Sequence, residues 1–234
     1  MVKFLPNKWE IMIGIIFTGG EAPDTQFIKQ LIKEQTQKDT LFIAADSGLI
    51  TAQDAGVNPD WVIGDMDSID DKSRLSALPP DRIIRLTQDK DFSDTEMAFS
   101  LAFEKGCDQV WIIGGGGGRI DHLFGIRSLF ERDIFPYRWI TDSSDIYCID
   151  ADAVSGELIT VKCGQGDGNK EQIVSVFPLG NGPWEAVSSG LKWELKRLSW
   201  DRGFYGLSNV APDGCFSISA KQGRFMVVLL REFT

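Results

Sequence analysis

The sequence of 234 residues has few of the residues that hold metal-centred or disulfide-linked proteins together. Its four cysteines lie far apart, form no C-x-x-C pair, and stand at positions 107, 148, 163 and 215. This spacing argues against a zinc site and against a disulfide framework, and it favours reduced thiols. His122 is the only histidine, and no G-x-S-x-G motif accompanies it. We therefore expect His122 to be a local hydrogen-bonding partner rather than the base of a Ser-His-Asp triad.

Positive charge is also scarce. The chain has 24 Lys and Arg residues against 34 Asp and Glu residues, which gives a net charge of -10, and it has no Lys/Arg-rich run. Such a protein is a poor non-specific binder of nucleic acid, which rewards a basic surface. If the substrate is a polyphosphate, its charge has to be offset locally, most simply by a divalent metal ion.

Long hydrophobic runs are absent near the N-terminus. The apolar stretch at positions 11–17 is too short to span a bilayer, and polar residues interrupt the segment before it. We expect a cytoplasmic protein that is neither secreted nor embedded in a membrane.

Two common nucleotide-binding motifs are missing as well. No G-x-x-x-x-G-K-[ST] segment occurs, which disfavours a P-loop protein. The glycine run at positions 114–118 does not fit G-x-G-x-x-G, because the position of the third glycine holds Arg119 or Ile120. A dinucleotide-dependent dehydrogenase is therefore disfavoured too.

What the chain does contain is an alternation of apolar runs and amphipathic segments. Strands are expected at 9–17, 41–45, 61–63, 82–86 and 110–113. Helices are expected from Asp24 or Thr25, over 49–55, from a capping box at Ser93 to Gly106, and after Asp121. This alternation predicts an α/β domain with an open, mainly parallel sheet over residues 1–150. After that point short strand-like runs at 157–163, 173–179, 215–221 and 224–230 predict a small antiparallel β domain over residues 151–234.

Acidic residues follow the predicted parallel strands. Asp46 comes after the second strand, Asp65 and Asp67 after the third, and Asp91 and Asp94 after the fourth. Ligands of open parallel sheets bind outside the carboxyl ends of the strands, so we expect these carboxylates to meet there. If the turn after the third strand stays extended, Asp65 and Asp67 point the same way.

A cluster of this kind needs a cation, because two carboxylates 4 Å apart repel by roughly 4 kcal/mol at an effective dielectric constant of 20. Ligands that are all oxygen favour Mg²⁺, which leaves room for substrate phosphates. The alternative is a solvated acidic loop with ordinary helix caps, and for any single aspartate it explains the sequence equally well.

The glycine run at 114–118 predicts a second part of the same site. Backbone N–H groups in such a loop can approach an anion, and a helix is expected to begin close by. Arg119 can add bidentate contacts to phosphate oxygens. The alternative is a flexible tight turn with no ligand.

Taken together and in order, these motifs resemble those of the thiamin pyrophosphokinase family. The matching strings in the first domain are ADSG (45–48), PDWVIGDMDSI (59–69), KDFSDTEMA (90–98) and GGGGGRIDH (114–122). Those in the second domain are VSVFPL (174–179), GLKW (190–193) and SN (208–209). The resemblance spans nearly the whole chain.

The resemblance implies an enzyme that transfers the pyrophosphoryl group of ATP to the hydroxyl of thiamin, giving thiamin diphosphate and AMP. It implies Mg²⁺ as cofactor, a nucleotide-binding α/β domain followed by a β-sandwich for thiamin binding and dimerisation, and a homodimer with the active site at its interface. No nucleic-acid or membrane partner is implied.

The resemblance also assigns site residues by their motifs. It places four aspartates in catalysis: Asp46, Asp67, Asp91 and Asp94. It places four at the metal: Asp46, Asp65, Asp67 and Asp94. It implies contacts to ATP or its phosphates from Ser47, Lys90, Ser93, Gly116, Gly117, Gly118, Arg119 and Asp121. It implies thiamin contacts from Trp193, Ser208 and Asn209, although Trp193 as a core aromatic is the alternative.

Two other functions stay open at this point. One is a module that senses a nucleotide or thiamin without turnover, and the other is a Mg²⁺-dependent phosphohydrolase. Binding alone should not need so many acidic residues in one place, which favours the enzyme.

Overall fold

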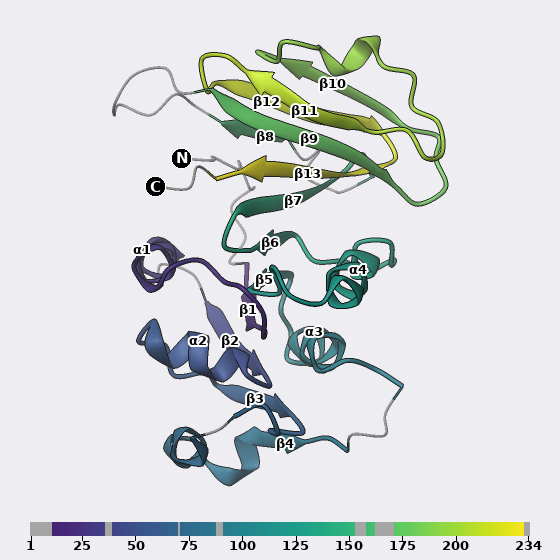
Figure 1. The fold of residues 1–234 in the computed structure, drawn as a ribbon. Coiled ribbons are helices and arrows are strands. Elements are labelled where there is room, and N and C mark those ends of the chain that lie inside the picture. Colours follow the sequence, from purple (N-terminus) through teal and green to yellow (C-terminus); the bar gives the residue numbers. More distant parts are fainter. Residues whose placement is uncertain are drawn as a thin grey trace. The chain divides into compact units, whose positions relative to one another are not determined.

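The computed structural model describes residues 11–35, 39–69, 71–87, 91–152, 158–161 and 171–231. These residues fall into two compact units, with the division between Ser143 and Ser144. We call them the N-terminal unit and the C-terminal unit, and Figure 1 labels their helices and strands.

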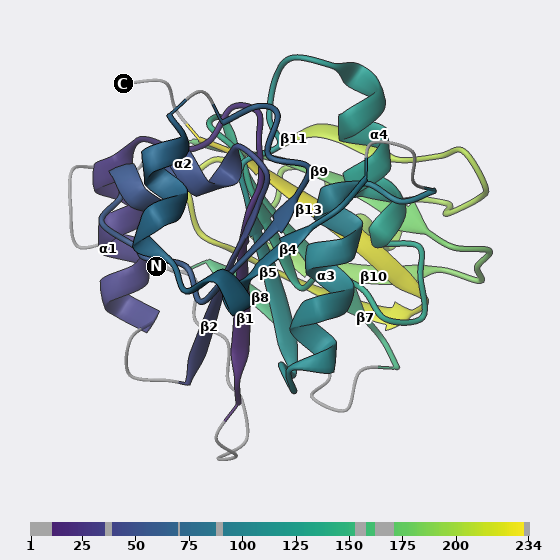
Figure 2. The same cartoon turned by 90° about the horizontal axis from the view of Figure 1, so that it is seen from below.

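The N-terminal unit is built on a parallel sheet in the order β6-β5-β1-β2-β3-β4. Its strands are β1 (Ile13–Phe17), β2 (Thr40–Ala45), β3 (Trp61–Gly64), β4 (Ile83–Arg85), β5 (Gln109–Ile113) and β6 (Arg138–Ile140). Its helices are α1 (Thr25–Gln35), α2 (Gly48–Asp54), α3 (Asp94–Glu104) and α4 (Ile120–Leu129), with short 3-10 helices η1 (Lys72–Ala77) and η2 (Pro80–Arg82). Helices α1 and α2 lie on one side of the sheet and α3 on the other (Figure 2). The predicted α/β class with a mainly parallel sheet is confirmed.

Helix boundaries in this unit follow from capping groups in the sequence. The Asp24 carboxylate accepts the N–H groups of Gln26 and Phe27 at 2.9 Å each, so it ends the loop and starts α1. Ser93 and Glu96 form the predicted capping box at the start of α3. Burial of apolar side chains on one face then fixes each helix to the sheet, as Ile28 shows in α1.

The C-terminal unit consists of two antiparallel sheets that share one hydrophobic cluster. One sheet has the order β7-β13-β9-β11 and the other β10-β12-β8. The strands are β7 (Ser144–Asp150), β8 (Leu158–Val161), β9 (Gln172–Leu179), β10 (Glu185–Ser189), β11 (Gly206–Ala211), β12 (Phe216–Gln222) and β13 (Arg224–Leu230), and η3 (Leu195–Arg197) is a short 3-10 helix. Val176 and Phe225 from one sheet and Ile218 from the other belong to the shared cluster. Strands were predicted at the positions of β8, β9, β12 and β13. The other strands, β6, β7, β10 and β11, were not predicted, because they are short or rich in polar residues. The sequence EAVSS of β10 is an example.

The cysteines follow the prediction in part. Cys107 and Cys148 are buried thiols that form no disulfide. Cys215 is disulfide-bonded, so the expectation of reduced thiols is wrong at that position. Within the described ranges, no helix has the length and apolar character needed to cross a membrane.

Gly48 provides a test of how tightly α2 packs against β1. A Cβ at this position would lie 2.1 Å from the carbonyl oxygen of Phe17, the last residue of β1. We expect Gly48→Ala to push α2 away from β1 and to lower the free energy of unfolding by about 1–3 kcal/mol. Gly125→Ala is the control, because nothing lies within 4 Å of the added Cβ in α4. It should raise stability by up to ~1 kcal/mol through helix propensity. Denaturant unfolding of both variants checks this, and equal stability of the two would contradict it.

Candidate active site

Three predicted carboxylates meet at the carboxyl ends of neighbouring strands. Ligand oxygens of Asp46, Asp65 and Asp67 all lie within 4.8 Å of one another. Asp46 follows β2, while Asp65 and Asp67 follow β3, and these two strands pair in parallel so that their ends coincide. The expectation that these three side chains come together is therefore confirmed. We call them the carboxylate cluster.

A turn in the local backbone brings the carboxylates of the cluster together. Met66 lies in the left-handed region at φ 64°, so the segment after β3 turns instead of staying extended. The Asp67 N–H donates to Oδ1 of Asp65 at 3.1 Å within that turn. Met66 is 1% exposed and anchors the turn in the core. The turn expected after β3 is present but is not extended, and its tight form brings the carboxylates of Asp65 and Asp67 together.

Close contact between two chain segments sets the position of Asp46. A Cβ on Gly64 would lie 3.2 Å from the Cα of Asp46, so only a glycine leaves β3 this near to the residue after β2. Asp46 itself has φ 49°, an unfavourable conformation for a residue with a side chain. Strain of this kind at a cluster of like charges is typical of functional sites.

The electrostatics of the cluster favour a cation. Oδ1 of Asp46 is buried, and no group among the described residues hydrogen-bonds to it. A buried carboxylate oxygen without a partner is costly, and the two neighbouring carboxylates add repulsion. An oxygen-only donor set with one shielded oxygen fits a hard divalent ion such as Mg²⁺.

Asp91 and Asp94 do not join the carboxylate cluster in the described structure. Asp94 is the first residue of α3 and is partly buried, whereas Asp91 is exposed in the loop before it. The hydroxyl of Thr95 hydrogen-bonds to that of Thr18 at 2.6 Å, and Thr18 directly follows β1. The start of α3 is therefore held at the same edge of the sheet as the cluster. Lys90 lies outside the described residues.

Ser93 uses its polar groups for the capping box. Its hydroxyl accepts the N–H of Glu96 at 3.2 Å, and its own N–H donates to Oε2 of Glu96 at 2.9 Å. Burial alone would raise the pKa of Glu96, but hydrogen bonds from Ser93 and Arg132 outweigh it and lower that pKa. A phosphate contact from Ser93 stays a prediction.

Ser47 stands directly before α2, and its hydroxyl lies near Gly19, because a Cβ on Gly19 would come within 2.5 Å of it.

The glycine loop differs from the prediction in the use of its N–H groups. Those of Gly114, Gly115 and Gly116 donate to the carbonyl groups of Ile140, Gly19 and Glu21 at 2.9, 2.8 and 2.9 Å. The expectation that the whole run leaves its N–H groups open to an anion is therefore wrong for these three, because the loop pairs with β6 and with the segment after β1. Gly117 and Gly118, with φ values of 57° and 64°, form its exposed tip.

Arg119 and Asp121 contact each other beside that tip. Nε and Nη2 of Arg119 donate to the two oxygens of Asp121 at 3.1 and 2.5 Å, and both residues are exposed. These hydrogen bonds lower the pKa of Asp121 and raise that of Arg119. The backbone N–H of His122 donates to the Asp121 carboxylate at 3.1 Å, whereas the local role expected for the His122 imidazole stays a prediction.

In the C-terminal unit, the predicted thiamin-contact residues lie together. The side chain of Trp193 is 52% exposed, so the alternative of a core aromatic is wrong. Asn209 is 4% exposed, and its amide bonds both backbone groups of Trp193: Oδ1 accepts the N–H at 3.2 Å and Nδ2 donates to the carbonyl at 2.6 Å. Ser208 is exposed at φ 54°, and its N–H donates to the Ser175 hydroxyl at 3.0 Å. Nζ of Lys192 lies 4.6 Å from the centre of the Trp193 ring.

Sequence reasoning missed two contacts that hold the edge of the sheet together. Thr18 and Thr95 are 77 residues apart, and Glu96 and Arg132 are 36 residues apart. Neither pair carries a local sequence signal, because each depends on how distant elements pack. The capping box marked Glu96 as a helix-start residue but not its second partner.

Together, the parallel sheet and the carboxylates at its strand ends define an α/β protein with a site suited to a divalent cation. Residues 32–134, which include the carboxylate cluster, match the family model described as "Thiamin pyrophosphokinase, catalytic domain". The chain is 29% identical over 164 residues to a thiamine pyrophosphokinase of Bacillus subtilis (strain 168), covering 68% of this chain and 72% of that protein. The resemblance to the thiamin pyrophosphokinase family is confirmed.

Solved structures show the same fold. The thiamine pyrophosphokinase of Bacillus subtilis superposes with a TM-score of 0.72 at 24% identity, covering 95% of this chain and all of that one (100%). The thiamin pyrophosphokinase of Candida albicans superposes with a TM-score of 0.68 at 15% identity, covering 95% of this chain and 90% of that one. At these identities the similarity concerns the fold.

A metal-binding test of the carboxylate cluster follows from its repulsion. We expect Mg²⁺ at 100 times its Kd to raise the free energy of unfolding of the unmodified protein by about 2.7 kcal/mol. Asp65→Asn should lose most of that gain, and without Mg²⁺ it should be the more stable protein because one charge is removed. Denaturant unfolding with and without Mg²⁺ measures both effects.

Asp81→Asn is the matched control, because the Asp81 side chain is 80% exposed and lies outside the cluster. It should keep the full response to Mg²⁺. An equal Mg²⁺ response in Asp65→Asn and Asp81→Asn would rule out the cluster as the metal site.

Proposed function

We propose that this protein is a thiamin pyrophosphokinase, which transfers the pyrophosphoryl group of ATP to the hydroxyl of thiamin and releases AMP. The observation that carries the proposal is the carboxylate cluster, with its unpartnered buried Asp46 oxygen, inside the segment that matches the family's catalytic domain. A phosphate-transfer enzyme mainly positions groups and offsets charge, and this cluster is suited to both.

Asp46, Asp65 and Asp67 would hold Mg²⁺, the cofactor that we propose. When bound, Mg²⁺ neutralises phosphate charge and so lowers the repulsion that an incoming oxygen meets. Arg119, oriented by Asp121, presents a guanidinium beside the exposed tip of the glycine loop and can bind phosphate oxygens. We propose further ATP contacts from Ser47, Lys90, Ser93, Gly117 and Gly118.

The reaction forms a bond between the thiamin oxygen and the β-phosphorus of ATP. The bond from that phosphorus to the oxygen of the α-phosphate breaks, and AMP leaves with the electron pair. The hydroxyl proton passes to a carboxylate, for which Asp67 and Asp94 are both candidates. We propose Asp91 as a further catalytic residue. This accounts for each atom of the two products.

Trp193 is proposed to bind the cationic thiazolium ring of thiamin. The Lys192 ammonium already lies over this ring, and this contact supports the proposal that the indole face binds positive charge. Asn209 would act by fixing the Trp193 backbone, and Ser208 would line the same surface. We also propose a cytoplasmic homodimer in which residues 151–234 serve thiamin binding and dimerisation.

A product assay tests the function. Incubation with ATP, Mg²⁺ and thiamin should give thiamin diphosphate and AMP in equal amounts, measured by chromatography. ADP in place of AMP would exclude pyrophosphoryl transfer, ATP consumption without thiamin would indicate a phosphohydrolase, and binding without products would indicate a sensor.

Asp67→Asn should lower turnover at least 100-fold while circular dichroism stays unchanged.

Trp193 and Asn209 give a second test, on substrate binding. Trp193→Ala should raise KM for thiamin by about 3- to 30-fold with little change in kcat, since cation–π contacts contribute roughly 0.5–2 kcal/mol. Asn209→Ala should raise the same KM and also lower stability, because the Trp193 backbone loses two hydrogen bonds. Lys192→Met is the control that keeps the indole and removes the competing cation, and it should not raise KM. Unchanged thiamin KM in Trp193→Ala would contradict the assignment.

A further inference from the structure

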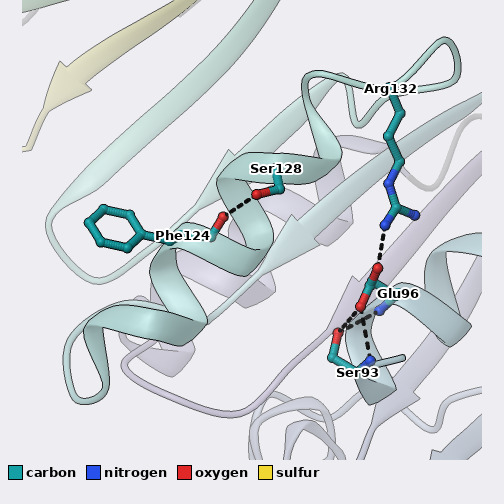
Figure 3. Close-up of polar contacts among 5 residues, drawn as sticks. All are labelled: Ser93, Glu96, Phe124, Ser128 and Arg132. Carbon is teal, nitrogen blue, oxygen red and sulfur yellow. Dashed lines mark hydrogen bonds and ion pairs between the residues drawn. The ribbon is translucent and has the colours of Figure 1, made fainter. Parts of the chain in front are cut away.

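The carboxylate of Glu96 accepts hydrogen bonds from two separate segments of the chain, and neither contact has a role in the proposed reaction. Figure 3 shows one oxygen of Glu96 at Ser93, and the other at the guanidinium of Arg132. On the Ser93 side, Oε2 accepts the backbone N–H at 2.9 Å and the hydroxyl at 3.1 Å. On the Arg132 side, Oε1 accepts from Nη2. Glu96 therefore joins the first turn of α3 to the segment that follows α4.

One end of this connection lies in a motif of the proposed site, and the other follows a helix that begins at a second motif. The first turn of α3 carries Asp94 and Thr95, and Thr95 bonds to Thr18 at the end of β1. Arg132 follows α4, the helix that begins directly after Arg119. Contacts with Thr18 and Arg132 thus hold the start of α3 from two sides.

We propose that Arg132 is a positioning residue that acts through Glu96 to hold the first turn of α3, and with it Asp94, in the geometry needed for catalysis. The proposal rests on the proposed function only in its catalytic consequence, since the contact itself is independent of it. Arg132 contacts Glu96 rather than a substrate, and its effect on the reaction is transmitted through the backbone of the helix start.

The expected effects on stability and on reaction rate distinguish a positioning role of Arg132 from a merely structural one. The side chains of Arg132 and Glu96 are 43% and 22% exposed, and ion pairs with this much solvent access contribute little to global stability. A catalytic group displaced by about 1 Å can lose about 100-fold in rate. A positioning role therefore predicts a large effect on kcat with a small effect on unfolding.

Arg132→Met tests the proposal, with Arg127→Met as its matched control. Arg127 has the same exposure of 43% and pairs with Glu131 four residues further on, not with α3. We expect Arg132→Met to lower kcat about tenfold or more while Tm and KM for thiamin stay close to those of the unmodified protein. Arg132→Lys should restore most of the rate, and Arg127→Met should stay within twofold. Equal rates for Arg132→Met and Arg127→Met would overturn the proposal.

A double-mutant cycle tests whether Arg132 acts through Glu96. If it does, Glu96→Gln combined with Arg132→Met should reduce kcat no further than the more severe single variant. Multiplicative losses would show that the two residues act separately, which would also overturn the proposal.

Hydrogen exchange separates this proposal from the proposed function. The N–H groups of Glu96 and Met97 bond to Ser93 in the first turn of α3, so their protection reports on that turn directly. Protection should fall in Arg132→Met and not in Arg127→Met, whether or not the protein makes AMP. Unchanged protection in Arg132→Met would refute the positioning role, whereas lost protection in a protein that makes no AMP would refute only the catalytic function.

Discussion

The repulsion among the three carboxylates of the cluster is the constraint around which the edge of the parallel sheet is organised. Two such charges at 4 Å repel by roughly 4 kcal/mol at an effective dielectric constant of 20, so the fold has to hold them together. Met66, between Asp65 and Asp67, is 1% exposed and packs with Ala44 and Val62. Full burial of a methionine side chain contributes roughly 1.5–3 kcal/mol, an amount comparable with the repulsion of one pair. The apolar anchor thus offsets much of what the polar site costs.

Backbone conformation adds to the same cost. Asp46 and Met66 both adopt left-handed backbone, which costs roughly 1–2 kcal/mol per residue with a side chain. Asp46 has to take this conformation where β2 passes directly beside Gly64 at the end of β3. Strain and repulsion therefore coincide at one point, and a cation bound there would relieve the repulsion. This supports a ligand-binding role for the cluster over an ordinary acidic loop.

What could be predicted from the sequence depended on how local the cause was. Asp46, Asp65 and Asp67 were found because strand ends of a parallel sheet share an edge, a rule that needs only strand positions. The turn after β3 was expected, but its left-handed residue Met66 was not, because left-handed backbone at a methionine has no local sequence signal. The glycine loop was misread in part, since the carbonyl groups that occupy its N–H groups come from Gly19, Glu21 and Ile140. Arg132 could not be found at all, because its partner lies in another helix.

Exposed aromatic side chains are useful for binding only if the backbone beneath them is already ordered. Trp193 is held through two hydrogen bonds from the buried amide of Asn209, which itself also accepts the N–H of Val210 at 2.8 Å. Ordering a loop during binding subtracts from affinity, so a residue fixed in advance retains more of its contact energy. The buried amide of Asn209 forms hydrogen bonds to the backbone of Trp193, whose indole stays largely in water. Stability alone therefore does not readily explain this arrangement. The arrangement is explained if that indole face is a binding surface, and Arg132 and Glu96 follow the same logic at the start of α3.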